Sequence, residues 1–286
     1  MSEGNQMEKK MPVVASIVLY KHTQQELQPT IDSLLSEALV ETIILVDNAG
    51  CEWAAHINNP RIVYIKSDKN GGFGHGHNQA MAAFLDKCEY FIICNPDIEF
   101  DVGTVETLYR FAKQNQHAFL APNIIYPNGE KQRVCRLLPT PANLLLRRFV
   151  PFFAKFFDKK YELHGVDDTQ NFFAPSISGC FIFAQADLLK KVQGFDSRYF
   201  MYLEDVDLCR KVLAYTKPIF CAGATVKHSF AKGSYKNYKL LGYHIQSAIH
   251  YFNKWGWFID SERSNINKKC LDQLPSITVQ VRKENQ

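Results

Sequence analysis

The sequence predicts an α/β protein built around a doubly wound, mostly parallel sheet. Residues 13–100 alternate short apolar runs with polar and amphipathic stretches, which is the pattern of strands connected by helices. The apolar runs are continuous, as expected for strands that are buried on both faces. Polar side chains follow the ends of these runs, and in such sheets ligands bind at the carboxyl ends of the strands.

The predicted elements follow this alternation along the chain. The run VVASIVLY at 13–20 predicts the first strand, and apolar residues at helical spacing predict an amphipathic helix over 25–38. A glycine-rich turn at 70–76 precedes the second helix. Further strands are expected at residues 41–50, 61–67, 90–100, 119–126 and 224–229, and further helices at 78–87, 102–115 and 235–254. In the stretch from residue 178, a small-residue turn leads into another apolar strand, and a helix pattern follows before Gly194.

The chain of 286 residues is predicted to form a single domain. Its hydrophobic fraction of 46% is ordinary for a globular protein and supports a sizeable core. We find no repeat, low-complexity tract or convincing linker. The sequence therefore predicts one domain over residues 12–260, preceded by a disordered N-terminus at 1–11 and followed by a loosely held polar tail at 261–286.

Charge and cysteine usage narrow the class of protein. A net charge of +4 is too weak to indicate nucleic-acid binding, although it suits a partner that carries phosphates. No two of the eight cysteines form a C-x-x-C pair, which favours reduced thiols in a cytoplasmic protein. The N-terminus has no apolar signal core, and no window approaches the ~18 apolar residues of a membrane span.

Residues 144–161, LLLRRFVPFFAKFFDKKY, combine bulky apolar and basic side chains. Six leucine and phenylalanine side chains of this stretch can share one helical face, with arginines and lysines beside it. That combination is typical of a helix lying in a membrane interface. The alternative is a helix packed on the body of the protein, and the choice depends on whether the apolar face is exposed.

Glu204 and Asp205 are the strongest candidates for catalytic residues. They directly follow the apolar and aromatic residues 200–203 and precede a predicted helix that begins at Val206. Burying two acids costs free energy unless they bind something or exchange a proton. The alternative is that both acids cap the helix, where negative charge is favoured near the N-terminus.

Seven segments give the chain a wider resemblance. They are SIVLYKHTQQELQPTIDSL, IILVDNAG, NGGFGHGHNQAM, YFIICNPDIEF, GEKQRVCRLLPTP, SGCFIF and GFDSRYFMYLEDVDLCRKV. In this order they resemble the inverting family 2 glycosyltransferases of the GT-A fold, and within them the rhamnosyltransferase-like branch. The resemblance covers about residues 13–255. It implies a donor-binding half at about 12–100, an acceptor and catalytic half at about 101–260, and a C-terminal helical extension on the acceptor side.

The resemblance implies roles for the acids. Asp205 matches the family's catalytic base, which takes the proton of the acceptor hydroxyl, and Glu204 would position it or hold the acceptor. Asp97 matches the last acid of an Asp-x-Asp motif that holds Mg²⁺ or Mn²⁺ on the donor phosphates. Asn95 replaces the first acid, which should weaken the metal site. His228 resembles the late histidine that completes the metal shell in many of these folds.

The nucleotide-sugar donor would lie along the carboxyl edge of the sheet. Asp47 resembles the acid that binds the pyrimidine base, and Lys21 replaces the asparagine that usually follows the tyrosine of the first strand. The glycines of the 70–76 loop would let the backbone approach the nucleotide, or would serve a tight turn that needs positive φ. The candidate residues for donor and diphosphate contacts are Tyr20, Asp47, Asn70, Gly71, Gly72, Asn95, Arg136, Lys232 and Lys236.

The leading hypothesis is an inverting, non-processive glycosyltransferase of bacterial surface glycan synthesis, such as O-antigen or capsule. By resemblance it uses dTDP-L-rhamnose and acts on a lipid-linked or polysaccharide acceptor at the cytoplasmic face of the inner membrane. A UDP-hexose or UDP-N-acetylhexosamine is the alternative donor. A sugar-nucleotide nucleotidyltransferase usually opens with a glycine-rich loop that SIVLYKHTQQE lacks, and a non-catalytic nucleotide-sugar-binding protein need not keep both Asp97 and Asp205.

Overall fold

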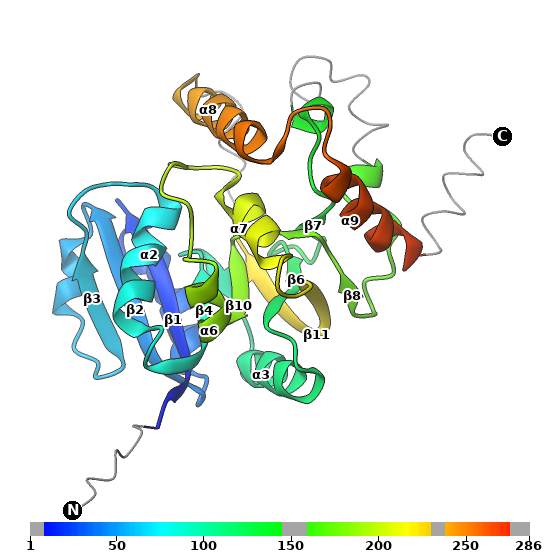
Figure 1. The fold of residues 1–286 in the computed structure, drawn as a ribbon. Coiled ribbons are helices and arrows are strands. Elements are labelled where there is room, and N and C mark those ends of the chain that lie inside the picture. The colour runs from blue at the N-terminus through cyan, green and yellow to red at the C-terminus, as the bar shows by residue number, and fades with distance from the viewer. Residues whose placement is uncertain (1–8, 145–158, 230–237, 275–286) are drawn as a thin grey trace, which may run out of the picture.

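The computed structural model describes residues 9–144, 159–229 and 238–274, and a mixed sheet runs through its centre (Figure 1). The strands lie in the order β3-β2-β1-β4-β10-β6-β11-β5, and β8 also pairs with β11. Two short strands, β7 and β9, pair separately. The strands are β1 Met11–Tyr20, β2 Val40–Ala49, β3 Ile62–Lys66, β4 Cys88–Cys94, β5 Ile98–Glu99, β6 Phe119–Ile125, β7 Cys135–Arg136, β8 Phe172–Phe173, β9 Ser176–Ile177, β10 Phe181–Gln185 and β11 Ile219–His228.

The first four strands of the sheet are parallel, as the sequence predicts. Strand β1 lies between β2 and β4, and β3 pairs with the outer side of β2. The predicted strand at 90–100 is divided into two. Strand β4 ends at Cys94, directly before Asn95-Pro96, and β5 pairs instead with the end of β11. Proline cannot donate a ladder hydrogen bond, so Pro96 separates the two strands.

The second half of the sheet departs from the parallel arrangement. Strand β10 is antiparallel to both of its neighbours, β4 and β6, while β6 and β11 are parallel. Its first residue, Phe181, pairs with Cys94 at the carboxyl end of β4. The chain thus enters this strand from the edge at which the parallel strands end, and it has to run back through the sheet.

Helices cover the sheet and extend beyond it (Figure 1). Helix α2 begins at Phe73 rather than at residue 78, because Gly72 has a φ of +91° and turns the chain directly into the helix. Thr23 and Glu26 form a reciprocal capping box at the start of α1. The helices are α1 Gln24–Leu35, α2 Phe73–Phe84, α3 Thr104–Asn115, α6 Ala186–Lys191, α7 Glu204–Val212, α8 Tyr238–Trp255 and α9 Ser261–Asp272, with a 3₁₀ turn at Glu52–His56.

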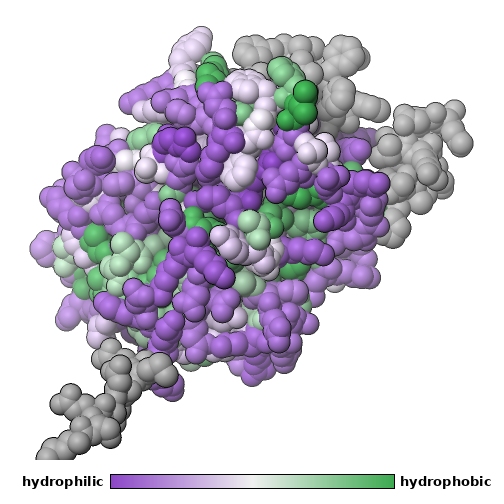
Figure 2. Space-filling model, in the orientation of Figure 1, coloured by the Kyte–Doolittle hydropathy of each residue, from purple (hydrophilic) through white to green (hydrophobic). Residues whose placement is uncertain are grey.

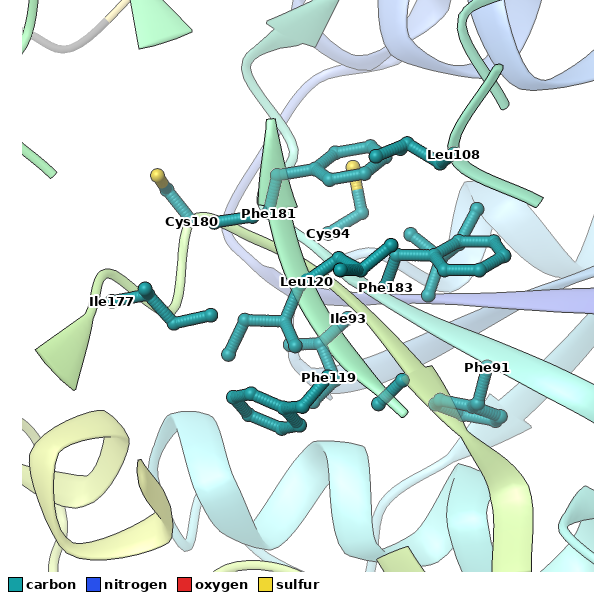
Figure 3. Packing of buried hydrophobic residues seen from close by; sticks show 14 of the residues in the cluster. Phe91, Ile93, Cys94, Leu108, Phe119, Leu120, Ile177, Cys180, Phe181 and Phe183 are labelled. Atoms are coloured by element: carbon teal, nitrogen blue, oxygen red, sulfur yellow. The ribbon is translucent and has the colours of Figure 1, made fainter. Parts of the chain in front are cut away.

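Aromatic side chains fill the core where β4, β10 and β6 meet (Figure 3). Phe91, Phe119, Phe181 and Phe183 are fully buried there. A second, smaller apolar cluster lies between α7 and α8. Its buried members are Leu138, Tyr199, Leu203, Val206, Ala248, Tyr251 and Phe252.

The prediction of a loosely held tail from residue 261 is wrong for its first part, because residues 261–272 form α9. Asn267 exchanges two hydrogen bonds with the backbone of Leu138, at 2.8 and 3.0 Å. Gln273 does the same with Phe173, and Cys270 is fully buried. The polar composition is misleading here, since these side chains bind backbone groups that lie a hundred or more residues away in the sequence.

The visible face of the molecule is largely hydrophilic, with scattered apolar residues (Figure 2). No helix within the described ranges is long and apolar enough to cross a membrane. All eight cysteines are buried free thiols. Most of the 144–161 stretch lies outside the described residues, so its membrane role stays a prediction.

Candidate active site

The predicted acid pair opens helix α7. The carboxylate of Asp205 accepts hydrogen bonds from the backbone N–H groups of Gly179 and Val206, at 3.0 and 2.8 Å. Glu204 is buried, and its Oε2 atom has no hydrogen-bond partner among the described residues. The N-cap position belongs to Leu203, whose side chain cannot accept a hydrogen bond. Neither acid is therefore the N-cap residue. Asp205 satisfies one amide of the first turn, but the Oε2 atom of Glu204 binds none, so helix capping accounts for at most one of the two acids.

The environment of the pair favours the protonated forms. Burial raises the pKa of Glu204, and the negative charge of Asp205 adds to this effect. Burial also raises the pKa of Asp205, although hydrogen bonds from Gly179 and Val206 and the nearby Arg136 oppose it. Two acids whose pKa values are raised by burial are typical of a site that takes up or releases a proton.

The backbone before the pair adopts an unusual conformation. Tyr202 and Leu203 have φ values of +71° and +64°, a left-handed region that bulky residues rarely occupy. Residues held in this way cost on the order of 1 kcal/mol each and persist only where the surroundings fix them. The Phe73 N–H donates to the Phe200 carbonyl at 3.2 Å, and the Ser247 hydroxyl donates to the Met201 carbonyl at 2.8 Å. Helices α2 and α8 thus hold the segment that carries the acids.

Two adjacent residues connect the acid pair with the Asn95-Pro96-Asp97 turn. The N–H of Gly179 donates to Asp205, and the carbonyl of Cys180 accepts from the Asn95 N–H at 2.8 Å. The turn before β10 therefore brings together residues that are about a hundred positions apart in the sequence. A Cβ at Gly179 would lie 3.2 Å from the Asp205 side chain, so glycine suits the close approach.

The predicted metal ligands also meet. The Asp97 carboxylate lies 3.1 Å from Nε2 of His228, and the Asn95 amide lies 3.3 Å from the same nitrogen. The other ring nitrogen of His228 is 2.9 Å from the side-chain oxygen of Gln132, which fixes the orientation of the ring. Burial opposes the charged form of His228, but the interactions with Asp97 and Cys180 outweigh it and raise the pKa of His228 to about 10.

These residues fit a divalent cation that shares its ligands with a substrate. One carboxylate and one imidazole suit Mn²⁺ better than Mg²⁺, which prefers oxygen ligands, and either cation can take further oxygens from phosphates. His228 would have to lose its proton when the metal binds. Across the described ranges, no group of three or more His, Cys, Asp or Glu side chains could hold a metal ion. The prediction that Asn95 weakens the site is consistent with this small set of ligands.

Asp47 and Asn48 lie where the sequence predicts the base of the nucleotide. Both are buried at the carboxyl end of β2, and the Oδ1 atom of each has no hydrogen-bond partner among the described residues. The other oxygen of Asp47 accepts from the Cys51 N–H at 3.1 Å and the Tyr64 hydroxyl at 3.0 Å. Burial and the bond to Asp47 raise the pKa of Tyr64 to about 12. Two buried acceptors without partners suit a ligand that presents N–H groups.

The remaining predicted donor contacts surround this position. Tyr20 is 48% exposed at the end of β1, and Asn70 accepts a hydrogen bond from the Gly72 N–H. The structure gives its own reason for both glycines. A Cβ at Gly71 would lie 2.3 Å from the His75 ring, and one at Gly72 would lie 1.8 Å from the Phe200 carbonyl. Tight packing within the protein requires them, and their contact with a nucleotide stays a prediction.

Of the three predicted cationic contacts, one can be placed. Arg136 lies on β7, its guanidinium donates to the Arg133 carbonyl at 3.3 Å, and its buried Nε atom has no partner in the described part of the chain. The positive charge of Arg136 opposes the rise in the pKa of Asp205, so Arg136 lies close to the acid pair. Lys232 and Lys236 lie outside the described residues.

The sequence did not identify three residues that hold the site together. Asn78 exchanges two hydrogen bonds with the backbone of Phe195, at 2.8 and 2.9 Å. Gln132 binds both the ring and the carbonyl of His228. Asp207 is fully buried one turn after the acid pair. All three residues lie inside the segments that carry the resemblance, and this position was the available signal.

The chain is similar to a known protein family and to several characterised proteins. A family model described as glycosyl transferase family 2 matches residues 16–178. A low-salt glycan biosynthesis hexosyltransferase from Haloferax volcanii is 23% identical over 200 residues, which is 68% of this chain and 60% of that protein. An N-acetylglucosaminyl-diphospho-decaprenol L-rhamnosyltransferase from Mycobacterium tuberculosis is 26% identical over 193 residues, 62% of each chain.

Solved structures give the same fold at low identity. GalNAc-T7 with UDP, GalNAc and Mn²⁺ matches with a TM-score of 0.60 at 13% identity, over 79% of this chain and 44% of that one. TarS from S. aureus in complex with UDP matches with a TM-score of 0.58 at 14% identity, over 91% of this chain and 71% of that one. These likenesses confirm the GT-A fold that the resemblance implied.

The match with the family model covers more than half of the chain and includes Asp47 and Asp97, while Asp205 and His228 follow beyond it. The matched stretches cover 60 to 62% of the length of the Haloferax and Mycobacterium relatives. With the acid pair, the Asn-Pro-Asp turn and the late histidine assembled at one edge of the sheet, the chain belongs to glycosyl transferase family 2.

Proposed function

We propose that this protein is an inverting, non-processive glycosyltransferase in which Asp205 is the catalytic base. The observation that carries the proposal is the turn at Gly179-Cys180. It binds the carboxylate of Asp205 with one residue and the backbone of Asn95 with the next. A proton acceptor and the group that would bind the donor phosphates therefore lie on either side of a single turn.

Direct displacement at an anomeric carbon needs a base that removes the proton of the acceptor hydroxyl. Two backbone N–H groups hold the carboxylate of Asp205 in place. Orientation of this kind supports catalysis because a catalytic group has to meet the reacting atom in a narrow range of geometry. The buried, unpartnered oxygen of Glu204 would bind a second polar group of the acceptor.

The departing nucleoside diphosphate would lie along the carboxyl ends of β2, β1 and β4. Asp47 lies near the end of β2, Tyr20 ends β1, and Asn95 directly follows β4. Two inter-strand spacings, about 10 Å, therefore separate the base site from the Asn-Pro-Asp turn. Asp47 and Asn48 would accept hydrogen bonds from a pyrimidine base. Asp97 and His228 would hold Mg²⁺ or Mn²⁺, which neutralises charge on the diphosphate when bound.

The identity of the substrates is inferred from relatives. The Mycobacterium relative is named an N-acetylglucosaminyl-diphospho-decaprenol L-rhamnosyltransferase. WbbL of Escherichia coli K12, 24% identical over 154 residues, is also named a rhamnosyltransferase. On this basis we propose dTDP-L-rhamnose as donor and a lipid-linked acceptor of bacterial surface glycan synthesis. A protein with that acceptor would work at the cytoplasmic face of the membrane. The basic and apolar composition of residues 144–161 suits contact with such a surface.

A donor screen tests the proposal. Purified protein would be incubated with Mg²⁺ or Mn²⁺ and dTDP-L-rhamnose, UDP-glucose, UDP-galactose, UDP-N-acetylhexosamines or GDP sugars. Thermal stability and release of the nucleoside diphosphate would be followed, since a bound ligand raises the apparent stability. Asp47→Ala, which removes an acceptor for the base, is the matched variant.

The expected result is stabilisation and turnover with dTDP-L-rhamnose, and loss of the stabilisation in Asp47→Ala. A response to a UDP-hexose or UDP-N-acetylhexosamine instead would keep the transferase and change the sugar. No stabilisation and no turnover with any donor, in the presence of either metal, would contradict the proposed function.

A further inference from the structure

A chain of buried ionic contacts lies behind the acid pair, on the side of α7 that faces α8. Asp207, three residues after Glu204, is fully buried. The ammonium of Lys254 lies 2.8 and 2.9 Å from its two oxygens, and the Trp255 N–H donates to it at 2.7 Å. Lys254 also binds Asp196 at 3.0 Å. The last turn of α8 is therefore joined to the first turn of α7.

One turn further along α7, Arg210 extends the contact with the segment that follows α8. Arg210 forms a two-point ion pair with Asp260 at 2.6 and 2.8 Å and reaches Glu262 at 3.2 Å. Its guanidinium also lies 4.8 Å from the centre of the Trp255 ring. Both Arg210 and Asp260 are almost fully buried. The segment from Lys254 to Glu262 thus binds α7 over two successive turns.

Helix α7 needs such external support at its N-terminus. It has no side-chain cap, and it follows two residues with positive φ. Without a cap, the first turn of a helix frays easily. The Asp205 contact with Gly179 fixes one side of this turn, and Asp207 with its partners on α8 fixes the other.

We propose that Lys254 and Trp255 are positioning residues for the catalytic pair, acting through Asp207 to fix the first turn of α7. This inference rests on the proposed role of Asp205 as base. Neither residue lies at the carboxyl ends of β1, β2 and β4, where the donor would bind. Their loss should therefore impair the chemical step and leave donor binding intact.

The central variant is Lys254→Met, which removes the cation and leaves Asp207 buried without its charge partner. We expect kcat to fall about tenfold or more, because small displacements of a catalytic group have large effects on rate, with the KM for the donor unchanged. The double variant Lys254→Met/Asp207→Asn restores neutrality, while Asp196 keeps Arg198 as its partner. We expect it to recover most of the lost kcat.

Trp255→Phe is the milder second variant, in case Lys254→Met fails to fold. It removes one hydrogen bond to Asp207 and keeps an aromatic ring beside Arg210, so kcat should again fall with donor KM unchanged. Lys113→Met is the matched control. It removes a lysine that pairs with Glu89 on the other side of the sheet, and its kcat should match that of the wild type.

Hydrogen exchange of the amides of residues 204–208 separates this inference from the proposed function, because it needs no substrate. Exchange should accelerate in Lys254→Met and Trp255→Phe and recover in the double variant. If no donor is ever turned over, this measurement still shows whether α8 fixes α7. Unchanged exchange and unchanged kcat in both single variants would overturn the inference, as would a double variant no better than Lys254→Met.

Discussion

The two halves of this molecule are held together in different ways. In the first half, β3, β2, β1 and β4 form a parallel ladder. Most residues of β2, β1 and β4 are buried on both faces, and the edge strand β3 is partly exposed. In the second half, side chains join the elements by binding distant backbone groups or buried charges. Asn267 binds the backbone of Leu138, Gln273 binds that of Phe173, and Arg210 pairs with Asp260. The first half is built mainly on this regular ladder, although Arg61 also binds backbone carbonyls of residues 35, 37 and 40 there. The second half depends more on individual contacts.

The candidate site takes residues from both halves. Asp47 lies near the end of β2 and Asp97 comes shortly after β4, at the edge where sheets of this kind bind their ligands. Asp205 and His228 come from the second half and reach the site through specific contacts with Gly179 and Gln132. The regular half thus presents the edge at which we propose that the donor binds, and the irregular half presents the proposed base to it.

Removal of the proposed base should have the largest effect. Asp205→Asn keeps the shape of the side chain and removes its ability to take a proton, so the transfer rate should fall by about 10²- to 10⁴-fold. Donor binding, which depends on the first half, should stay as in the wild type. Steady-state transfer rates and donor titration would measure both. Asp101→Asn, at an exposed position, is the control. Turnover close to that of the wild type would remove Asp205 from this role.

The second-largest effect is expected at the contact between the two halves. Asn78→Ala removes both hydrogen bonds from α2 to the backbone of Phe195 and leaves two polar groups poorly satisfied. Unfolding free energy should fall by about 2–3 kcal/mol, as measured by denaturant titration. Gln79→Ala, next in the same helix, removes one hydrogen bond to Ser67 and should cost about 0.5 kcal/mol. Equal losses in the two variants would show that the Asn78 contact does not join the halves.

A metal titration tests whether the Asn-Pro-Asp turn binds a divalent cation. Asn95→Asp adds a carboxylate beside Nε2 of His228, so the Mg²⁺ or Mn²⁺ concentration for half-maximal activity should fall by about tenfold, since added ligand charge tightens such sites. Activity would be measured after removal of metal with EDTA and stepwise return. Asn128→Asp, in an exposed turn, is the control and should leave the titration unchanged. Full activity of the EDTA-treated wild type would contradict a metal at Asp97.

The smallest expected effect concerns the pH dependence of stability. Burial and the charge of Asp205 raise the pKa of Glu204 above its ordinary value of 4.5. At pH values between these two pKa values, Glu204 is protonated in the folded state and ionised in the unfolded state. The stability of the wild type therefore falls as pH rises above the ordinary value. Glu204→Gln lacks this loss and should be more stable than the wild type by about 1 kcal/mol at pH ~9, with a smaller difference at pH ~5.

Thermal unfolding at the two pH values would check this expectation. Glu41→Gln, at an exposed position of β2, is the matched control and should show no such difference. A stability gain in Glu204→Gln that is equal at both pH values would show that the buried carboxyl carries no proton linkage.

The regular half of the fold could be predicted almost completely from the sequence. Strands β1 to β4 lie within two residues of their predicted starts, because continuous apolar runs report burial directly. Helix α2 was misplaced, since the left-handed Gly72 that starts it depends on the position of Phe200. In the other half, the apolar run after residue 180 predicts the strand β10, but neither its antiparallel direction nor the helix α9 was expected. Neither direction in a sheet nor binding to a distant backbone leaves a local pattern.

The sequence by itself determined the parallel ladder, the line of polar residues at its carboxyl edge and, by resemblance, the acids that serve the site. Only the tertiary structure decided that Gly179 binds Asp205, that His228 meets Asp97, and that Lys254 pairs with Asp207. The physical reason is the range of the interactions. Hydrophobic periodicity follows from neighbours along the chain, whereas a hydrogen bond or ion pair between distant segments exists only once the fold has brought them together.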